Sequence, residues 1–173
     1  MKWLIFSLVG LVYSLTLYVV PHSHCDAGWL QSFDDYYNSK VQHIITNSVK
    51  IMDLNPSYKF VWAETSFLKK WMEEQSNKTR EKMKELIRSG NIEIVGGGYA
   101  QNDEALPDFE AVIRNIETGH KYLKETFGIS QVKVAWQIDP FGHSALTPSI
   151  FSKFGYEYMV GSRIDSKFKV TCK

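Results

Sequence analysis

Two histidines and an aspartate alternate near the start of the chain. His22, His24 and Asp26 occupy every second position of the stretch HSHCD. In an extended segment, residues two apart share one face, so that an imidazole nitrogen and a carboxylate oxygen can bind the same cation. His24 and Asp26 are therefore candidate metal ligands. His22 is either a third ligand or a group that orients the other two.

A second carboxylate with the same potential comes much later in the chain. Asp139 directly follows the apolar stretch 132–138, and Pro140 ends that stretch at once. A carboxylate placed there could meet the same metal from another strand. Asp-Pro is also typical of a turn or a helix cap, and the residues alone leave this alternative open.

The elements that must position these residues alternate between strands and helices. Apolar stretches predict strands at 17–20, 60–63, 92–95, 132–138 and 158–160. Apolar residues at three- and four-residue spacing predict helices within 44–54, 78–89, 109–123 and 148–154. This order predicts βαβ units, and hence an α/β fold with parallel strands and no internal domain boundary.

Polar or glycine-rich sequence follows every expected strand. Active sites of such folds gather at the carboxyl ends of the parallel strands, so these segments are expected to form one rim. The segments are 22–26, 64–66, 96–104, 139–144 and 161–163. Gly96 to Gly98 lack the lysine and the spacing of a phosphate-binding loop, which disfavours nucleotide binding. They are expected instead to let the backbone pass close to a bulky ligand.

Composition narrows the classes of function. The chain has 173 residues, 44% of them hydrophobic, which is enough for one packed domain. A net charge of +1 gives no electrostatic basis for binding nucleic acid or a charged membrane surface. The two cysteines, Cys25 and Cys172, form no CxxC pair, which excludes a thiolate zinc finger. Cys25 is interpreted as a small buried side chain, with a disulfide to Cys172 or a metal role as the alternatives.

The amino terminus has the features of a targeting segment. Met1 and Lys2 precede an apolar run that extends to Val20. We interpret residues 1–16 as a signal peptide, with a membrane anchor as the alternative, and residues 17–20 as the first strand. Asn77-Lys78-Thr79 is an N-glycosylation sequon, so Asn77 is a candidate glycosylation site. Both features predict the secretory pathway, meaning lysosome, Golgi or secretion, with membrane contact only through the targeting segment.

Several separate motifs together resemble one enzyme family. The stretches HSHCDAGW, GGGYAQNDEA and WQIDPFGHS occur in this order, with FDDYY, FVWAETSFLKKW, ETFGI and GSRID around them. From about Val19 to Lys169 the chain is similar to the retaining zinc α-mannosidases of glycoside hydrolase family 38. The resemblance implies that residues 17–173 are the N-terminal part of an α/β barrel. It also implies one Zn²⁺ and a substrate that is a mannose-containing oligosaccharide or N-glycan.

The resemblance also assigns roles to single residues. His24, Asp26 and Asp139 match zinc ligands, and Asp139 matches the catalytic nucleophile as well. The residues that match substrate-binding positions are Trp29, Phe141 and Arg163. His22 matches a residue close to the zinc that is not a ligand.

In the family, the general acid and a fourth zinc ligand, a histidine, come from beyond the length of this chain. We therefore expect the 173 residues to be a partial form of a longer enzyme and to be inactive alone. Glu64, Asp103 and Glu104 are expected to be capping or rim residues, not the missing acid. Two other interpretations remain: a zinc-dependent deacetylase or amidohydrolase on an α/β barrel, and a truncated product without catalysis.

Overall fold

The computed structural model describes residues 16–167. The expected targeting segment, residues 1–16, lies almost entirely outside this range, as does Cys172. Among the described residues, none of the helices has both the length and the apolar content needed to cross a membrane.

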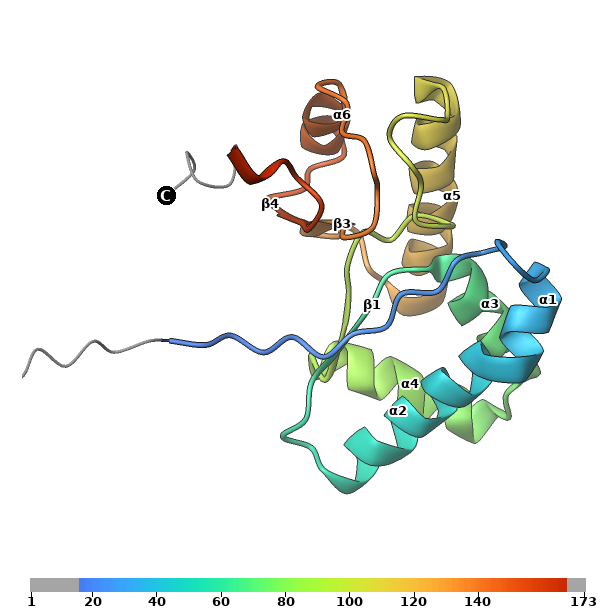
Figure 1. Ribbon diagram of the computed structural model, residues 1–173. Helices are drawn as coiled ribbons and strands as arrows, with labels where there is room; N and C mark the ends of the chain where they lie inside the picture. The colour runs from blue at the N-terminus through green and yellow to red at the C-terminus, as the bar shows by residue number, and fades with distance from the viewer. Residues whose placement is uncertain (1–15, 168–173) are drawn as a thin grey trace, which may run out of the picture.

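Helices and strands alternate along most of the chain (Figure 1). The helices are α1 (Phe33–Tyr36), the π-helix η1 (Tyr37–Val41), α2 (Gln42–Leu54), α3 (Thr65–Glu74), α4 (Asn77–Arg88), α5 (Phe109–Phe127) and α6 (Thr147–Lys153). The strands are β1 (Phe60–Trp62), β2 (Ile92–Ile94), β3 (Val134–Gln137) and β4 (Tyr158–Gly161). This order confirms the mixed α/β class that the sequence predicts.

All strand pairing in the described part of the chain is parallel. β1 pairs with β2, and β3 pairs with β4. The Gly96 N–H donates to the Val134 carbonyl over 2.7 Å, which joins the end of β2 to the start of β3. On the other side, the Val61 N–H donates to the Pro21 carbonyl over 3.0 Å. The segments therefore lie side by side in their order along the chain, as successive βαβ units require.

Local sequence explains where the longer helices begin and end. The Ser76 hydroxyl accepts a hydrogen bond from the Thr79 N–H at the start of α4, and the Asp108 carboxylate accepts one from the Ala111 N–H at the start of α5. These side chains satisfy N–H groups that have no partner inside the helix. Gly128 ends α5 with a φ of 73°, a left-handed conformation that favours glycine.

The expected first strand is wrong. Residues 17–20 form no strand, and Leu17, Tyr18 and Val19 are each more than three quarters exposed. Pairing starts only at His22, which forms an isolated parallel bridge with Val61. β1 begins at Phe60, so the residues before Pro21 have no partner strand to cover them. The apolar side chains of 17–20 predicted a buried strand. β1 is too short to extend beside these residues, so their side chains stay exposed.

The structure also differs from the expectations for the segments 64–66 and 96–98. Residues 64–66, expected at the rim, are buried, and α3 already begins at Thr65. The glycines of 96–98 pack against protein: a Cβ on Gly97 would lie 2.9 Å from the Val132 side chain. Gly119 of α5 is closer still, because a Cβ there would lie 2.0 Å from the Gly97 carbonyl oxygen. The glycines therefore allow α5 to approach this loop.

Two groups of helices surround the strands. In Figure 1, α1 to α4 lie together on one side, and α5 and α6 lie beside β3 and β4. The larger core cluster includes Tyr37, Phe67 and Trp71, none of which has exposed surface. A smaller cluster joins α5, β3 and α6 through Ile116, Ala135 and Phe151 and neighbouring apolar residues. These packed layers hold the carboxyl ends of the strands in fixed positions.

Candidate metal centre

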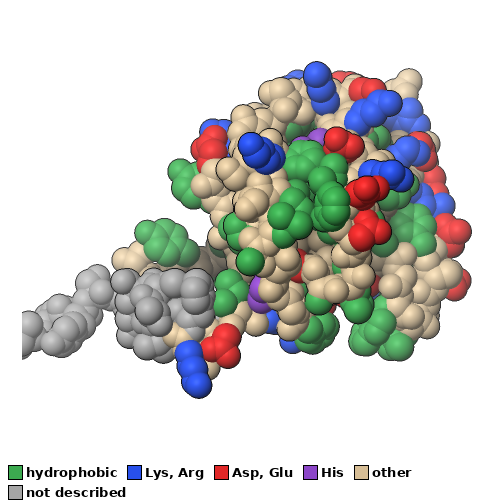
Figure 2. Space-filling model, turned by 90° about the horizontal axis from the view of Figure 1, so that it is seen from above, with side chains coloured by type: hydrophobic (Ala, Val, Ile, Leu, Met, Phe, Trp, Pro, Cys, Tyr) green, Lys and Arg blue, Asp and Glu red, His purple; other side chains and the backbone are tan. Residues whose placement is uncertain are grey.

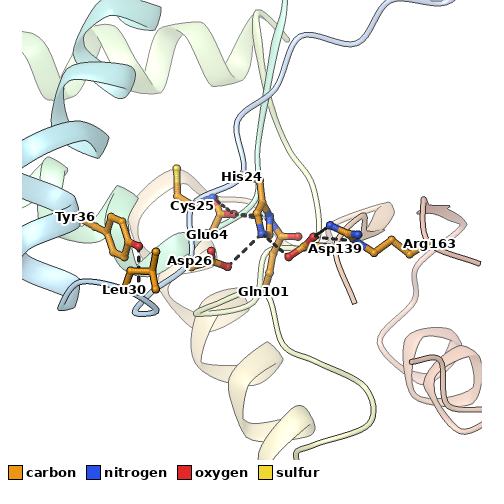
Figure 3. A network of polar contacts seen from close by, with 9 residues as sticks. All are labelled: His24, Cys25, Asp26, Leu30, Tyr36, Glu64, Gln101, Asp139 and Arg163. Carbon is orange, nitrogen blue, oxygen red and sulfur yellow. Dashed lines mark hydrogen bonds and ion pairs between the residues drawn. The ribbon is translucent and has the colours of Figure 1, made fainter. Parts of the chain in front are cut away.

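The side chains of His24, Asp26 and Asp139 come together although they are far apart in sequence (Figure 3). The Nε2 atom of His24 lies 3.2 Å from Oδ1 of Asp26 and 3.3 Å from Oδ2 of Asp139. One donor atom from each of the three residues can be chosen so that all lie within 4.8 Å of one another. The three residues predicted as metal ligands therefore form one cluster.

The strands explain this convergence. His24 follows the bridge between His22 and Val61 by two residues, and Asp139 follows the end of β3 by two residues. Both are at the carboxyl end of their segment, where parallel strands bring side chains to one edge. His22 is outside the cluster, and its ring packs edge-on against Trp136 with 5.4 Å between the centroids.

The donor set fits a zinc ion. Both ring nitrogens of His24 are buried and have no hydrogen-bond partner, although Nε2 lies at ion-pair distance from two carboxylates. An imidazole nitrogen with carboxylate oxygens is a common ligand set for Zn²⁺. A cation between these three side chains would use the free nitrogen and offset the repulsion between the carboxylates.

The intervening Cys25 does not belong to the ligand set. Its side chain is buried, as the sequence predicts for a small filler. Burial, with the nearby Glu64 carboxylate, raises the pKa of the Cys25 thiol to about 12. The side chains whose donor atoms lie close enough to share one metal ion are His24, Asp26 and Asp139, and this set leaves out the Cys25 thiol.

Arg163 binds the second oxygen of Asp139. Its Nε and Nη2 atoms donate to Oδ1 of Asp139 over 2.9 Å and 2.5 Å, while Oδ2 faces His24. The guanidinium also lies 4.3 Å from the centre of the Phe141 ring. The carboxylate predicted as the nucleophile is therefore held between a cationic group and the candidate metal position.

The three predicted substrate residues differ in their surroundings. Arg163 touches both Asp139 and Phe141, so these three are adjacent. The Phe141 ring is 77% exposed beside the cluster, where a sugar ring could contact it. Trp29 is 74% exposed in the segment between Asp26 and α1. Contact of Trp29 with a substrate stays a prediction.

Sequence reasoning missed the position of two acidic residues. Glu64, expected as a capping or rim residue, is at the N-cap position of α3, but it makes no side-chain capping hydrogen bond and is fully buried behind His24. Glu104 is also buried, and its carboxylate faces Nδ1 of His143 at 3.1 Å and accepts the N–H of Ser144. Glu104 thereby fastens the loop after β2 to the loop after β3. The only feature of the sequence that could have indicated the burial of Glu64 is its position directly between a strand and a helix.

The predicted glycosylation site is accessible. Asn77 is exposed at the first residue of α4, and Ser76, which caps that helix, contacts the Thr79 side chain and N–H. Attachment of a glycan to Asn77 stays a prediction.

The fold is that of an α/β protein, in which helices follow parallel strands. The cluster of His24, Asp26 and Asp139 at the carboxyl ends of the strands is its candidate metal centre. The chain belongs to glycoside hydrolase family 38, because the family model "Glycosyl hydrolases family 38 N-terminal domain" matches residues 14–171. This confirms the resemblance drawn from the motifs. The family match favours the glycosidase interpretation over the deacetylase and amidohydrolase alternatives.

Several similar proteins are named as alpha-mannosidases. Alpha-mannosidase C of Dictyostelium discoideum is 41% identical over 155 residues, which cover 90% of this chain and 14% of that protein. Alpha-mannosidase 2 of Rattus norvegicus is 38% identical over 155 residues, with 90% and 13% covered. Lysosomal alpha-mannosidase of Bos taurus is 37% identical over 164 residues, with 90% and 16% covered. The chain thus spans about one seventh of the length of these relatives.

A solved structure shares the fold. The crystal structure of an alpha-mannosidase from Enterococcus faecalis V583 superposes with a TM-score of 0.72 at 21% identity, covering 82% of this chain and 16% of that one. This likeness supports the arrangement of short parallel strands and covering helices.

Proposed function

We propose that this chain carries the nucleophile and three zinc ligands of a retaining α-mannosidase that removes terminal α-linked mannose from oligosaccharides such as N-glycans. The observation that carries the proposal is the placement of His24 Nε2 between the carboxylates of Asp26 and Asp139. Family membership supports the substrate class. Lysosomal relatives and the apolar amino terminus support a place in the secretory pathway.

The residues of the cluster have separate tasks in this proposal. His24, Asp26 and Asp139 would hold Zn²⁺, which supplies a Lewis acid for binding sugar hydroxyls. Arg163 holds Oδ1 of Asp139 and thereby fixes the orientation of the nucleophile. Phe141 offers an exposed ring against which the apolar face of a sugar can pack.

The reaction has two steps. A carboxylate oxygen of Asp139 forms a bond to the anomeric carbon while the bond from that carbon to the leaving oxygen breaks, and a carboxylic acid protonates the leaving oxygen. Water then attacks the same carbon, gives its proton to that acid group and releases Asp139, so that mannose leaves with retained configuration. We place the general acid and a histidine ligand outside the 173 residues, and we therefore expect the chain alone to be inactive.

Release of mannose from an aryl α-mannoside by the complete protein tests the proposal. The Asp139→Asn variant should lose activity by about 10⁴-fold, because it lacks the nucleophile. Removal of zinc with a chelator should abolish activity, and added zinc should restore it. Asp53→Asn serves as the control, because Asp53 pairs with Lys82 on the helical side of the molecule. Wild-type rates in Asp139→Asn would refute the proposal.

A further inference from the structure

The Glu64 carboxyl group is a buried acid that the proposed reaction does not use. It lies between β1 and α3 and has no exposed surface. Its Oε1 atom accepts hydrogen bonds from the Cys25 N–H, over 3.1 Å, and from the Gln101 side-chain amide. Its Oε2 atom is buried without a hydrogen-bond partner. A buried carboxylate with an unused oxygen is costly to the fold, which calls for a reason.

Glu64 and the metal cluster lie on different sides of one imidazole. Oε1 of Glu64 is 3.9 Å from Nδ1 of His24, whereas Nε2 of the same ring faces Asp26 and Asp139 (Figure 3). A neutral imidazole has one N–H and one lone pair. If the proton is on Nδ1, next to the carboxylate, the lone pair is on Nε2, where the two aspartates converge.

We propose that Glu64 is a positioning residue of the zinc centre, which accepts the Nδ1–H of His24 and so fixes the tautomer whose Nε2 binds the metal. Ligating histidines commonly donate their second N–H to a carboxylate, which orients the ring and strengthens the ligand. Movement of the ring by less than 1 Å would bring 3.9 Å to hydrogen-bond distance. This inference rests on the proposed zinc site and adds a residue to it.

Two further contacts hold Glu64 in place for this task. Cys25 lies between the ligands His24 and Asp26, so its N–H ties the ligand segment directly to the carboxylate. Gln101, from the loop after β2, donates to the same oxygen. Two segments that are separate in the sequence therefore converge on the Glu64 carboxylate behind His24.

Zinc affinity of the complete protein, measured by competition with a chromophoric chelator, tests the role of Glu64. Glu64→Gln keeps the size and one acceptor oxygen but replaces the carboxyl group by an amide, and it should bind zinc about 10- to 100-fold more weakly. Glu104→Gln is the matched control, because Glu104 is also buried and also faces the Nδ1 atom of a histidine, His143. Its zinc affinity should stay close to that of the wild type.

The outcomes separate the inference from the proposed function. Equal zinc affinity in Glu64→Gln and wild type would overturn the inference and leave the zinc site intact. An equal loss in Glu64→Gln and Glu104→Gln would also overturn it, because loosening of any buried loop would then explain the effect. A complete wild-type protein that binds no zinc would overturn both the inference and the proposed metal centre.

A second measurement needs no variant of Glu64 and therefore does not depend on its folding. Long-range ¹H–¹⁵N spectra of the zinc-loaded wild-type chain report which nitrogen of each histidine carries a proton. The His24 signals are assigned from the spectrum of His24→Gln. We expect a protonated Nδ1 and a metal-bound Nε2 in His24. A metal-bound Nδ1 would contradict the proposal.

Discussion

The carboxylate of Asp139 faces a different partner with each of its oxygens. Oδ1 accepts two hydrogen bonds from Arg163, and Oδ2 faces His24. A guanidinium can hold a carboxylate through two N–H groups in a fixed geometry, which a lysine ammonium cannot reproduce. The identity of the basic residue should therefore matter more for the orientation of the nucleophile than its charge does.

Arg163→Lys in the complete protein tests this point. We expect the kcat for an aryl mannoside to fall about tenfold, which corresponds to about 1.4 kcal/mol, because one of two hydrogen bonds to Asp139 is lost. Zinc content should be unchanged, because Arg163 is not a ligand. Arg88→Lys, at the exposed end of α4, is the control and should keep the wild-type rate. An unaltered kcat in Arg163→Lys would count against a positioning role.

At the scale of elements, α5 can pack close to the loop after β2 because residue 119 is a glycine and has no side chain. Gly119 faces the loop that contains Gly97, and a Cβ on Gly119 would lie 2.0 Å from the Gly97 carbonyl oxygen and 2.8 Å from the Tyr99 nitrogen. Neither contact can be relieved by rotating a side chain, because both atoms belong to the backbone. The loop also leads to Gln101, which donates to Glu64 in the site.

Gly119→Ala should destabilise the chain by about 3 kcal/mol or more, because α5 would have to move away from the loop. Chemical denaturation measures the free energy of unfolding. Gly28→Ala is the control, because only the Gln31 carbonyl oxygen lies near its position, at 4.0 Å. A similar stability for both variants would mean that α5 does not pack in this way.

The histidine next to Gly119 couples the same helix to pH. Nε2 of His120 lies 3.0 Å from the Tyr156 hydroxyl and 3.3 Å from the Gly96 carbonyl oxygen. Burial lowers the pKa of His120 below its usual value of 6.5, so the folded chain favours the neutral ring. The unfolded chain binds the proton more readily, so acid shifts the equilibrium toward unfolding.

The stability that the neutral His120 ring contributes is complete above the pKa of His120 in the unfolded chain, about 6.5. It is lost as the pH falls toward the lower pKa of His120 in the folded chain. The wild-type Tm, measured with chelator present, should therefore drop further between about pH 7.5 and about pH 5 than the Tm of His120→Gln. An equal drop in both proteins would show that His120 does not contribute.

At the scale of the whole molecule, the apolar surface is not fully covered. Figure 2 shows exposed hydrophobic side chains between acidic and basic ones on the face seen from above. Tyr158, Met159 and Val160 of β4 are each at least 40% exposed. Within residues 16–167, β4 pairs with β3 alone. An exposed apolar strand at the edge of a sheet favours association between chains.

The 173-residue chain should therefore self-associate as its concentration rises. Met159→Lys should reduce this association, because a charged side chain on an edge strand disfavours pairing. Sedimentation velocity across a concentration series measures the effect. Leu106→Lys is the control, since Leu106 is 84% exposed but lies in a loop. If both variants associate like the wild type, β4 is not the contact.

Sequence alone predicted the order of most elements, since alternating apolar stretches and helical spacing depend on local residues. The residues alone left open whether Asp139 would meet His24 and Asp26, because Asp-Pro is also typical of a turn, and the family resemblance assigned all three to one metal site. Sequence reasoning failed for residues 17–20, because burial depends on whether a partner strand lies beside them. It failed for Glu64 because the burial of a charged side chain follows from tertiary contacts.

The location of zinc in a crystal of the zinc-loaded chain tests the central claim most directly. Anomalous scattering at the zinc absorption edge identifies the metal and its position. We predict one strong peak about 2.0–2.2 Å from His24 Nε2 and from one carboxylate oxygen each of Asp26 and Asp139. A zinc peak away from these three residues, with none between them, would contradict the account.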